Sequence, residues 1–173
     1  MKLAITGATG FVGAATLDGA LIQGHEVRAL TRSAQSRRAG VEWVQGTLSD
    51  KSALTSLCEG TDAIIHIAGL TNTPDPAEFE IANVTGTDNV IAAAKQAGVD
   101  RFVFVSSLSA REPELSQYGL SKTRAEQLVG SSNLDWTTVR PPAVYGPRDK
   151  DMFELFRSAS FGLVPLPPKG TPS

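Results

Sequence analysis

The chain has 173 residues and a net charge of −2, with 41% hydrophobic and 20% charged residues. This composition excludes an intrinsically disordered chain, which would contain fewer apolar residues and carry more net charge. The near-neutral charge argues against a nucleic-acid partner, and no apolar run reaches the length of about 18 residues that a transmembrane helix needs. The N-terminus lacks the pattern of a secretion signal, so we expect a cytoplasmic protein. The single cysteine, Cys58, has no ligand cluster around it, so we predict no metal site.

Short apolar segments alternate with helical patterns along the chain. The predicted strands are residues 2–6, 26–31, 41–45, 63–68, 101–106 and 136–140. The predicted helices are residues 11–23, 50–59, 77–97, 117–129 and 151–159. Strands separated by helices form a parallel sheet covered on both faces, so we predict an α/β, doubly wound Rossmann-type fold. Such a fold binds its ligand at the carboxyl ends of the strands, where the strand order reverses.

The segment that follows the first predicted strand has a glycine at every third position and opens a helix. Glycines let the backbone approach a phosphate closely, and the helix N-terminus offers unpaired N–H groups and the positive end of a dipole. The strand–turn–helix context therefore predicts dinucleotide binding rather than a tight turn without a ligand. The predicted contacts in this turn are Gly7, Thr9, Gly10, Phe11, Val12 and Gly13.

The Gly-x-x-Gly-x-x-Gly spacing of this turn resembles the short-chain dehydrogenase/reductase superfamily, in particular its extended branch of epimerases, dehydratases and reductases. The resemblance extends to about residue 165 and rests on several further segments. It implies a cofactor of the NAD(P) type and chemistry at a substrate alcohol or ketone.

The end of the second predicted strand distinguishes NAD from NADP. An acidic residue at this position holds the ribose 2′-hydroxyl of NAD, whereas an arginine can hold the 2′-phosphate of NADP. The sequence has Arg32 and Ser33 there, with Arg37 and Arg38 following, and no carboxylate at the expected place. We therefore predict NADP, with NAD as the alternative, and Arg32 as the main phosphate contact assisted by Ser33. A solvated basic loop is the other interpretation of these arginines.

The turn after the third predicted strand, Gly-Thr-Leu-Ser-Asp, resembles the Gly-Asp-Leu turn that lies beside the adenine in this superfamily. Thr47 replaces the aspartate, so a carboxylate contact to the adenine is lost. The resemblance implies that Leu48 keeps a main-chain contact and that Thr47 lies beside the adenine.

The turn after the fourth predicted strand, His-Ile-Ala-Gly, resembles one that lines the cofactor. This resemblance implies that Ala68 and Gly69 contact the dinucleotide. His66, at the start of the turn, is better interpreted as a packed strand residue than as a catalytic base.

A phenol and an ammonium group are spaced four residues apart in the Tyr-Gly-Leu-Ser-Lys segment, which places Tyr118 and Lys122 on one face of a helix. A phenol is a poor base near neutral pH, and a nearby cation stabilises the phenolate. Tyr118 could then exchange a proton with a substrate alcohol or carbonyl during hydride transfer. The family pattern also implies that Tyr118 and Lys122 contact the cofactor, with Lys122 holding the nicotinamide ribose.

The fifth predicted strand ends in two serines. The resemblance implies that Ser107 hydrogen-bonds the substrate oxygen, and Ser106 is the alternative hydroxyl. Strand alternation points the two side chains to opposite faces, so only one should serve. Asn83 resembles the asparagine that supports the catalytic lysine in relatives, and a purely structural hydrogen bond is the alternative role for it.

The loop after the sixth predicted strand resembles the family's Arg-Pro-x-Asn-Val-Tyr-Gly-Pro segment, which borders the nicotinamide and the substrate. Its implied cofactor contacts are Pro141, Ala143 and Val144. Ala143 stands where sugar-nucleotide enzymes often carry an asparagine that holds the substrate diphosphate, and alanine cannot donate that hydrogen bond. This difference argues against a nucleotide-sugar substrate without excluding one.

We expect residues 1–150 to form a dinucleotide-binding domain that contains the catalytic residues. Relatives of the extended branch continue past this point, so we expect residues 151–173 to begin a smaller substrate-binding region of a longer protein. Residues 165–173 hold four of the ten prolines and are predicted to be neither helix nor central strand. The resemblance also implies a homodimer formed through the helices that carry Asn83 and Tyr118.

Two functions are compatible with these features. The first is an NAD(P)-dependent oxidoreductase, or an epimerase or dehydratase, acting on a small molecule that contains an alcohol or ketone. The second is a non-catalytic dinucleotide-binding module, such as a redox sensor or an assembly subunit. The serine, tyrosine and lysine occur together, which a mere binding module would not require, and this favours the enzyme.

Overall fold

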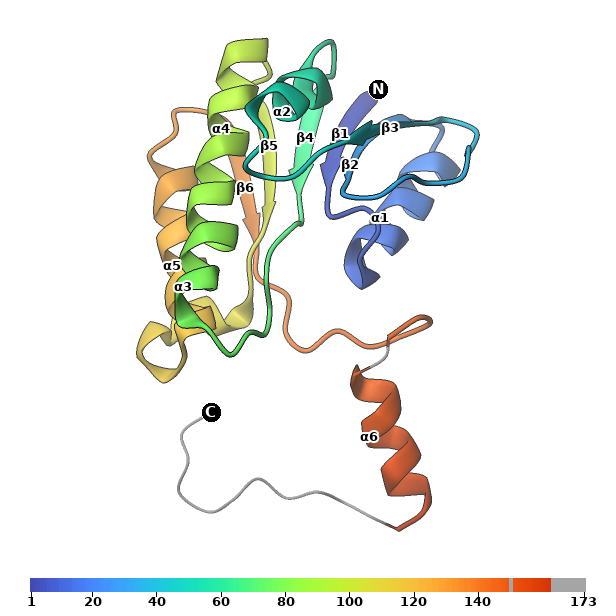
Figure 1. The fold of residues 1–173 in the computed structure, drawn as a ribbon, viewed down its shortest axis with the longest axis vertical. Helices are drawn as coiled ribbons and strands as arrows, with labels where there is room; N and C mark the ends of the chain where they lie inside the picture. The colour runs from blue at the N-terminus through green and yellow to red at the C-terminus, as the bar shows by residue number, and fades with distance from the viewer. Residues whose placement is uncertain (150, 163–173) are drawn as a thin grey trace. The chain divides into compact units, whose positions relative to one another are not determined.

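The computed structural model describes residues 1–149 and 151–162. The chain divides into two compact units, one from Met1 to Pro142 and a second that begins at Ala143, and each is described by itself. The larger unit contains six parallel strands in the order β3-β2-β1-β4-β5-β6 (Figure 1). The strands are β1 (Lys2–Thr6), β2 (Glu26–Thr31), β3 (Val41–Gln45), β4 (Ala63–His66), β5 (Arg101–Val105) and β6 (Asp135–Val139).

The strand order confirms the predicted doubly wound fold. The chain moves outward from β1 through β2 to β3, and then returns to place β4 on the other side of β1. The order therefore reverses between β1 and β4, whose parallel register pairs Thr6 with His66. Since ligands of open α/β sheets lie outside this reversal point, the ends of these two strands define where the functional site should be.

Helices connect the strands. The α-helices are α1 (Phe11–Ile22), α2 (Lys51–Cys58), α3 (Pro76–Phe79), α4 (Gly86–Ala97), α5 (Gln117–Gly130) and α6 (Asp151–Ser160), the last of which belongs to the second unit. A π-helical segment, η1 (Glu80–Thr85), joins α3 to α4, and two 3₁₀ segments, η2 (Leu108–Arg111) and η3 (Pro113–Leu115), lie between β5 and α5.

The core of the larger unit consists of two apolar clusters, one on each face of the sheet. Side chains of α2, α4 and α5, such as Leu54, Val90 and Val129, pack with Phe102 on one face. Leu17 of α1 packs with residues of β1 and β2 on the other face. The alternation of side chains along β1 sends Ala4 to the first cluster and Ile5 to the second, so the nearly continuous apolar strands stabilise both layers.

Two predicted elements differ from the structure. The single helix predicted over residues 77–97 is divided into α3, η1 and α4, because the six-residue π-helical segment η1 interrupts the α-helical hydrogen bonding. The strand predicted over residues 63–68 ends at His66, because the N–H of Ala68 donates to the hydroxyl of Thr6 rather than to a neighbouring strand. The other boundaries agree within two residues. The proline-rich segment 165–173 lies outside the described residues.

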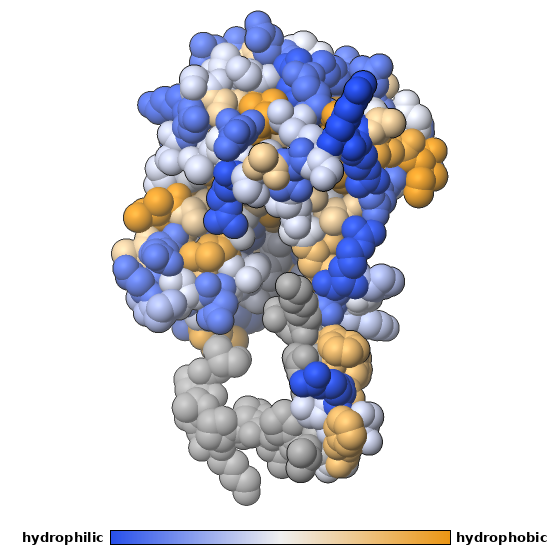
Figure 2. Space-filling view, turned by 45° about the vertical axis from the view of Figure 1, so that its right-hand side comes forward, coloured by the Kyte–Doolittle hydropathy of each residue, from blue (hydrophilic) through white to orange (hydrophobic). Residues whose placement is uncertain are grey.

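The surface shown in Figure 2 is mostly hydrophilic, and its apolar residues form small separate patches. None of the helices among the described residues has the length and apolar character needed to cross a membrane. Likewise, within residues 1–149 and 151–162, no three His, Cys, Asp or Glu side chains gather into a group that could hold a metal ion.

Two glycines of α1 provide a test of the close packing at its first turn. A Cβ added at Gly13 would lie 1.9 Å from the carbonyl oxygen of Gly7, whereas one added at Gly19 would meet nothing within 4 Å. We expect Gly13→Ala to lower the free energy of unfolding by about 3 kcal/mol, and Gly19→Ala to raise it by about 0.5–1 kcal/mol. Urea denaturation of both variants measures this difference, and equal stability of the two would contradict the packing described.

Candidate active site at the carboxyl ends of the strands

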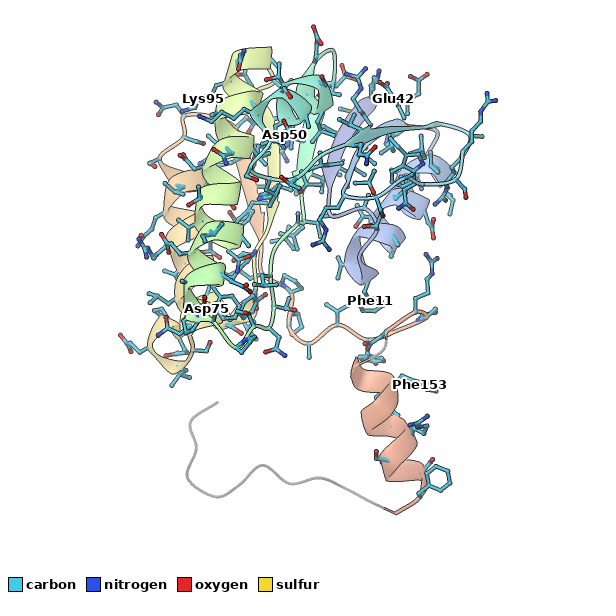
Figure 3. The ribbon with its side chains drawn as sticks, viewed as in Figure 1. Phe11, Glu42, Asp50, Asp75, Lys95 and Phe153 are labelled. Atoms are coloured by element: carbon cyan, nitrogen blue, oxygen red, sulfur yellow. The ribbon has the colours of Figure 1, made fainter. Side chains whose placement is uncertain are left out.

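The predicted site residues lie around one edge of the sheet. Figure 3 shows Phe11, the first residue of α1, and Asp75, which precedes α3, at the end of the larger unit toward which β1, β4 and β5 point. The side chain of Asp75 accepts a hydrogen bond from the N–H of Ala77 and so fixes the start of α3. The turns after β1, β4 and β5 therefore approach one another at this edge.

The glycine turn after β1 is compact and lies against the turn after β4. Gly7 has a φ of +75°, a left-handed conformation that favours glycine, and its missing Cβ would lie 2.7 Å from the amide nitrogen of Ala68. The N–H of Gly10 donates to the carbonyl of Gly7 at 2.9 Å, which closes the turn. Any larger residue at Gly7 or Gly13 would meet main-chain atoms, so the glycine spacing is required by the packing itself.

The start of α1 has the properties of an anion-binding site. Its N-cap is Gly10, which has no side chain to accept hydrogen bonds from the first-turn N–H groups. Those N–H groups, together with the positive end of the helix dipole, suit a phosphate group. The predicted cofactor residues Thr9, Phe11 and Val12 belong to this turn, and their contact with the pyrophosphate of a dinucleotide stays a prediction.

The segment after β2 is exposed, as expected for a loop that contacts a charged ligand. Thr31 donates its hydroxyl proton to the carbonyl of Ser33 at 2.7 Å, while the side chains of Arg32 and Ser33 are exposed. A hollow of about 410 Å³ lies beside the glycine turn. Its lining residues are Ala8, Thr9, Ala14, Leu17, Gln35, Ser36, Arg37, Arg38 and Trp43. Arg37, rather than Arg32, therefore borders this hollow, and Arg38 is held by an ion pair with Asp18 at 2.6 Å.

The turn after β3 is tied to the start of α4. The carbonyl of Leu48 accepts a hydrogen bond from the side-chain amide of Asn89 at 2.9 Å, and the Leu48 side chain fills the space beside Gly86. Thr47 is exposed, and its hydroxyl lies 2.9 Å from that of Ser49. The main chain of Leu48 is thus fixed, whereas the side chain of Thr47 is directed to solvent and to its neighbour.

Lys122 is buried, with 4% of its surface exposed. Its ammonium group donates to the carbonyl of Val105 at 2.9 Å and lies 4.4 Å from the centre of the Phe104 ring. Burial lowers the pKa of Lys122 from 10.5 to about 8, and the attraction of Glu126 opposes that shift. The ammonium atom also lies 3.8 Å from the position that a Cβ on Gly69 would occupy, so Lys122 reaches the turn after β4.

Asn83, in the π-helical segment η1, joins that same turn to α5. Its side-chain oxygen accepts from the N–H of Leu70 at 2.7 Å, and its amide nitrogen donates to the carbonyl of Leu70 at 2.9 Å. The same amide donates to the hydroxyl of Ser121, which in turn donates to the carbonyl of Tyr118. The side-chain hydrogen bonds of Asn83 therefore support both the turn after β4 and the helix α5, which carries Lys122.

Tyr118 and Ser107 lie on two elements that pack against each other, α5 and the start of η2. Ser116 caps the start of α5 by accepting from the N–H of Gly119 at 3.0 Å. A Cβ on Gly119 would lie 2.6 Å from the carbonyl oxygen of Ser109, so the first turn of α5 packs directly on η2, whose N-cap is Ser107. The half-buried Tyr118 ring lies 6.1 Å from that of Phe79. The two hydroxyl-bearing residues thus flank the same contact between η2 and α5.

The two serines at the end of β5 have different surroundings. Ser106 is 4% exposed and faces Glu126 of α5. Ser107 is partly exposed, and its hydroxyl oxygen accepts from the N–H of Ser109 at 3.2 Å. The alternation predicted for this strand end therefore holds, and Ser107 is the more exposed of the two hydroxyls at the carboxyl end of β5.

The loop after β6 is anchored at its first residues. The carbonyl of Pro141 accepts from the N–H of Leu108 at 2.9 Å, which connects it to η2. Arg140 donates to the carboxylate of Glu126 at 2.9 Å, and this pairing lowers the pKa of Glu126 against the opposing effect of burial. Ala143 and Val144 belong to the second unit, so their contacts with a cofactor stay predictions.

Sequence reasoning missed several residues that support the site. Glu126 follows Lys122 by four residues on α5, a spacing that could have identified it as an electrostatic partner of the lysine. Thr6 and Thr87 are buried polar residues that bond His66, and no local pattern reveals such contacts across the sheet. The interpretation of His66 as a packed strand residue is confirmed, since none of its surface is exposed.

Comparisons with known proteins show what this chain resembles. A family model described as NAD(P)H-binding matches residues 7–157. The chain is 40% identical over 162 residues to a ceramide reductase from Caulobacter vibrioides, covering 91% of this chain and 51% of that protein. It is 33% identical to a 2-alkyl-3-oxoalkanoate reductase from Stenotrophomonas maltophilia, covering 88% and 53% of the two chains. The chain thus spans about half the length of these curated relatives.

Among solved structures, the chain resembles the Bordetella bronchiseptica enzyme WbmH in complex with NAD⁺. The TM-score is 0.81 at 28% sequence identity, and the match covers 94% of this chain and 63% of that one. The similarity therefore extends over the whole six-stranded sheet and not only over the glycine turn.

The buried charge of Lys122 predicts a pH-dependent stability. Because burial lowers its pKa to about 8 from 10.5, the unfolded chain binds a proton that the folded chain lacks between these pH values. The free energy of unfolding should therefore rise with pH across this window, by up to about 3 kcal/mol, relative to a Lys122→Met variant. Chemical denaturation between pH 7 and 10.5 measures it. An exposed lysine on α4 offers the control Lys95→Met, and the account is contradicted if Lys122→Met shows the same pH dependence as wild type.

Proposed function

The chain belongs to the NAD(P)H-binding family, within the extended branch of the short-chain dehydrogenases/reductases, and from this premise we propose that its protein is an NADP-dependent ketone reductase. One observation supports a catalytic role above all. The side chains of the buried Lys122 and of Asn83 both lie beside Gly69 in the turn after β4, and Asn83 is linked through Ser121 to the carbonyl of Tyr118. A module that only binds a dinucleotide would not need this arrangement.

The residues of the chain would divide the reduction of a ketone among them. A bound NADPH supplies the hydride that adds to the carbonyl carbon. Tyr118 donates its phenolic proton to the carbonyl oxygen, so that hydride and proton together convert the ketone into an alcohol. Ser107 donates a hydrogen bond to the same oxygen and stabilises the charge that develops there. Lys122 holds the nicotinamide ribose and keeps a positive charge close to the phenol.

A reductase is favoured over an epimerase or dehydratase. Ala143 cannot donate the hydrogen bond by which sugar-nucleotide enzymes hold a diphosphate. The two curated relatives described above act, by their names, on ceramide and on 2-alkyl-3-oxoalkanoates. We infer that the substrate is a small molecule with a ketone and an alkyl portion rather than a nucleotide sugar. An epimerase that oxidises its substrate transiently is the alternative.

The organisation of the whole protein forms part of this proposal. Residues 151–173 would begin a substrate-binding region, and α6 within this stretch belongs to the unit that begins at Ala143. We propose a cytoplasmic protein that forms a homodimer through the elements that carry Asn83 and Tyr118, and the exposed apolar side chains of Ile81 and Leu120 support the dimer.

Removing the phenolic hydroxyl tests the catalytic role. Tyr118→Phe should lower kcat by about 10²–10⁴-fold with little change in the dissociation constant of NADPH, because only the proton donor is lost. Ser107→Ala should also lower kcat, while Ser106→Ala, on the buried side of the strand end, should leave it within about twofold. Ketone-dependent NADPH oxidation and fluorescence titration of NADPH give these values in the full-length protein. A Tyr118→Phe variant with full turnover would refute the mechanism.

The cofactor preference tests the assignment of the basic loop. Arg32 follows β2, and Arg37 borders the hollow beside the glycine turn. Since each guanidinium would bind the 2′-phosphate, Arg32→Ala and Arg37→Ala should each weaken NADPH binding by about tenfold and leave NADH binding unchanged. Arg101→Ala is the matched control, because Arg101 is the first residue of β5 and so lies at the amino end of that strand. Tighter binding of NADH than of NADPH by wild type would show that the NADP assignment is wrong.

A further inference from the structure

His66 is a completely buried polar residue that the proposed reaction does not use. It is the last residue of β4 and both of its ring nitrogens have hydrogen-bond partners. Its Nδ1 lies 2.6 Å from the hydroxyl of Thr6 at the end of β1, and its Nε2 lies 3.0 Å from the hydroxyl of Thr87 in α4. The ring therefore connects the strand before the glycine turn to the helix that follows η1.

The partners of the two threonines determine which ring nitrogen carries the proton. The hydroxyl of Thr87 donates its only proton to the carbonyl of Asn83 at 2.6 Å, so it can only accept from His66. The proton must then lie on Nε2, which leaves Nδ1 as an acceptor. Thr6 accordingly donates to Nδ1. The hydrogen bonds fix the neutral Nε2–H form of the ring.

These bonds belong to a closed ring of contacts around the turn after β4. The oxygen of Thr6 also accepts from the N–H groups of Ile67 and Ala68, both at 3.2 Å. Two residues further along, the side chain of Asn83 bonds both main-chain groups of Leu70. The main-chain carbonyl of Asn83 closes the ring through Thr87 and His66. The turn is thus held at both ends by one continuous set of hydrogen bonds.

The same histidine lies against the pocket of Lys122. Its ring stacks on Phe104 with the ring centres 5.6 Å apart, and the ammonium of Lys122 lies 4.4 Å from the centre of the Phe104 ring. Burial, and secondly the charge of Lys122, lower the pKa of His66 to about 3. His66 therefore stays neutral, and Lys122 is the cation of this part of the site.

We propose that His66 is a positioning residue for the cofactor: its fixed tautomer closes the hydrogen-bond ring that holds residues 67–70 in place between the glycine turn and Lys122. The inference rests on the proposed function, since Ala68 and Gly69 of this turn are predicted cofactor contacts. Gly7 lies against Ala68, and Lys122 lies beside Gly69, so a displacement of the turn would alter both halves of the binding site. His66 touches neither cofactor nor substrate and acts only through the turn.

Variants of Thr87 test the ring of hydrogen bonds without removing the histidine. Thr87→Val has nearly the same shape but neither donates to Asn83 nor accepts from His66, so it opens the ring. We expect it to raise the dissociation constant of NADPH by about tenfold in the full-length protein. Thr87→Ser keeps the hydroxyl and should bind NADPH within about twofold of wild type. Thr55→Val in α2 removes a similar hydroxyl-to-carbonyl bond that is not part of this ring and is the control.

A double variant shows whether the contacts act as one ring. His66→Phe should weaken NADPH binding by about tenfold as well, because it keeps an aromatic side chain but loses both hydrogen bonds. Once the ring is open, a second break should add little, so His66→Phe with Thr87→Val should bind NADPH about as weakly as either single variant. Independent roles in general packing would instead multiply the two losses, or would lower the unfolding midpoint without changing the dissociation constant.

The tautomer is measured independently by long-range ¹H–¹⁵N correlation of the imidazole rings, with His25→Gln to assign the signals of the two histidines. The expected result is a neutral Nε2–H ring for His66 from pH 5 to 8. A Nδ1–H ring, a charged ring, or a folded Thr87→Val protein that binds NADPH like wild type would overturn this inference. A wild-type protein that binds neither NADPH nor NADH would instead refute the proposed function.

Discussion

The contact between Gly7 and the main chain of Ala68 is the constraint on which the rest of the site depends. It joins the turns after β1 and β4, the two strands between which the order of the sheet reverses. The left-handed conformation of Gly7 and its missing side chain let the two turns meet. As a result, the glycine turn and the turn that carries Gly69 lie next to each other where the strand order reverses, and we propose that the dinucleotide binds there.

The second constraint on the site is the electrostatic environment of Lys122. A lysine that is almost fully buried has few ways to keep its charge, and Lys122 depends on the carbonyl of Val105, the face of Phe104 and the more distant Glu126. This environment stabilises the ammonium less well than water does, which is why burial lowers its pKa. In the proposed complex, the hydroxyls of the nicotinamide ribose would give this ammonium group further hydrogen-bond acceptors.

Local sequence patterns predicted much of this arrangement. The three glycines, the alternating elements and the Tyr118–Lys122 spacing each reflect a short-range requirement, and the structure places them in the fold expected. The π-helical segment around Asn83 could not be predicted, because its register depends on contacts with Leu70 and Ser121 that are distant in sequence. The same holds for the bonds of Thr6 and Thr87 to His66. Arg37 was noted beside Arg32, but only the folded loop shows which one borders the hollow.

The most direct test of the account is a crystal structure of the full-length protein with NADPH bound. The account predicts the pyrophosphate at the first turn of α1, the nicotinamide ribose beside Lys122, and the hydroxyl of Tyr118 facing the nicotinamide. A cofactor bound elsewhere, or one in this groove with Tyr118 directed away from the nicotinamide, would contradict it.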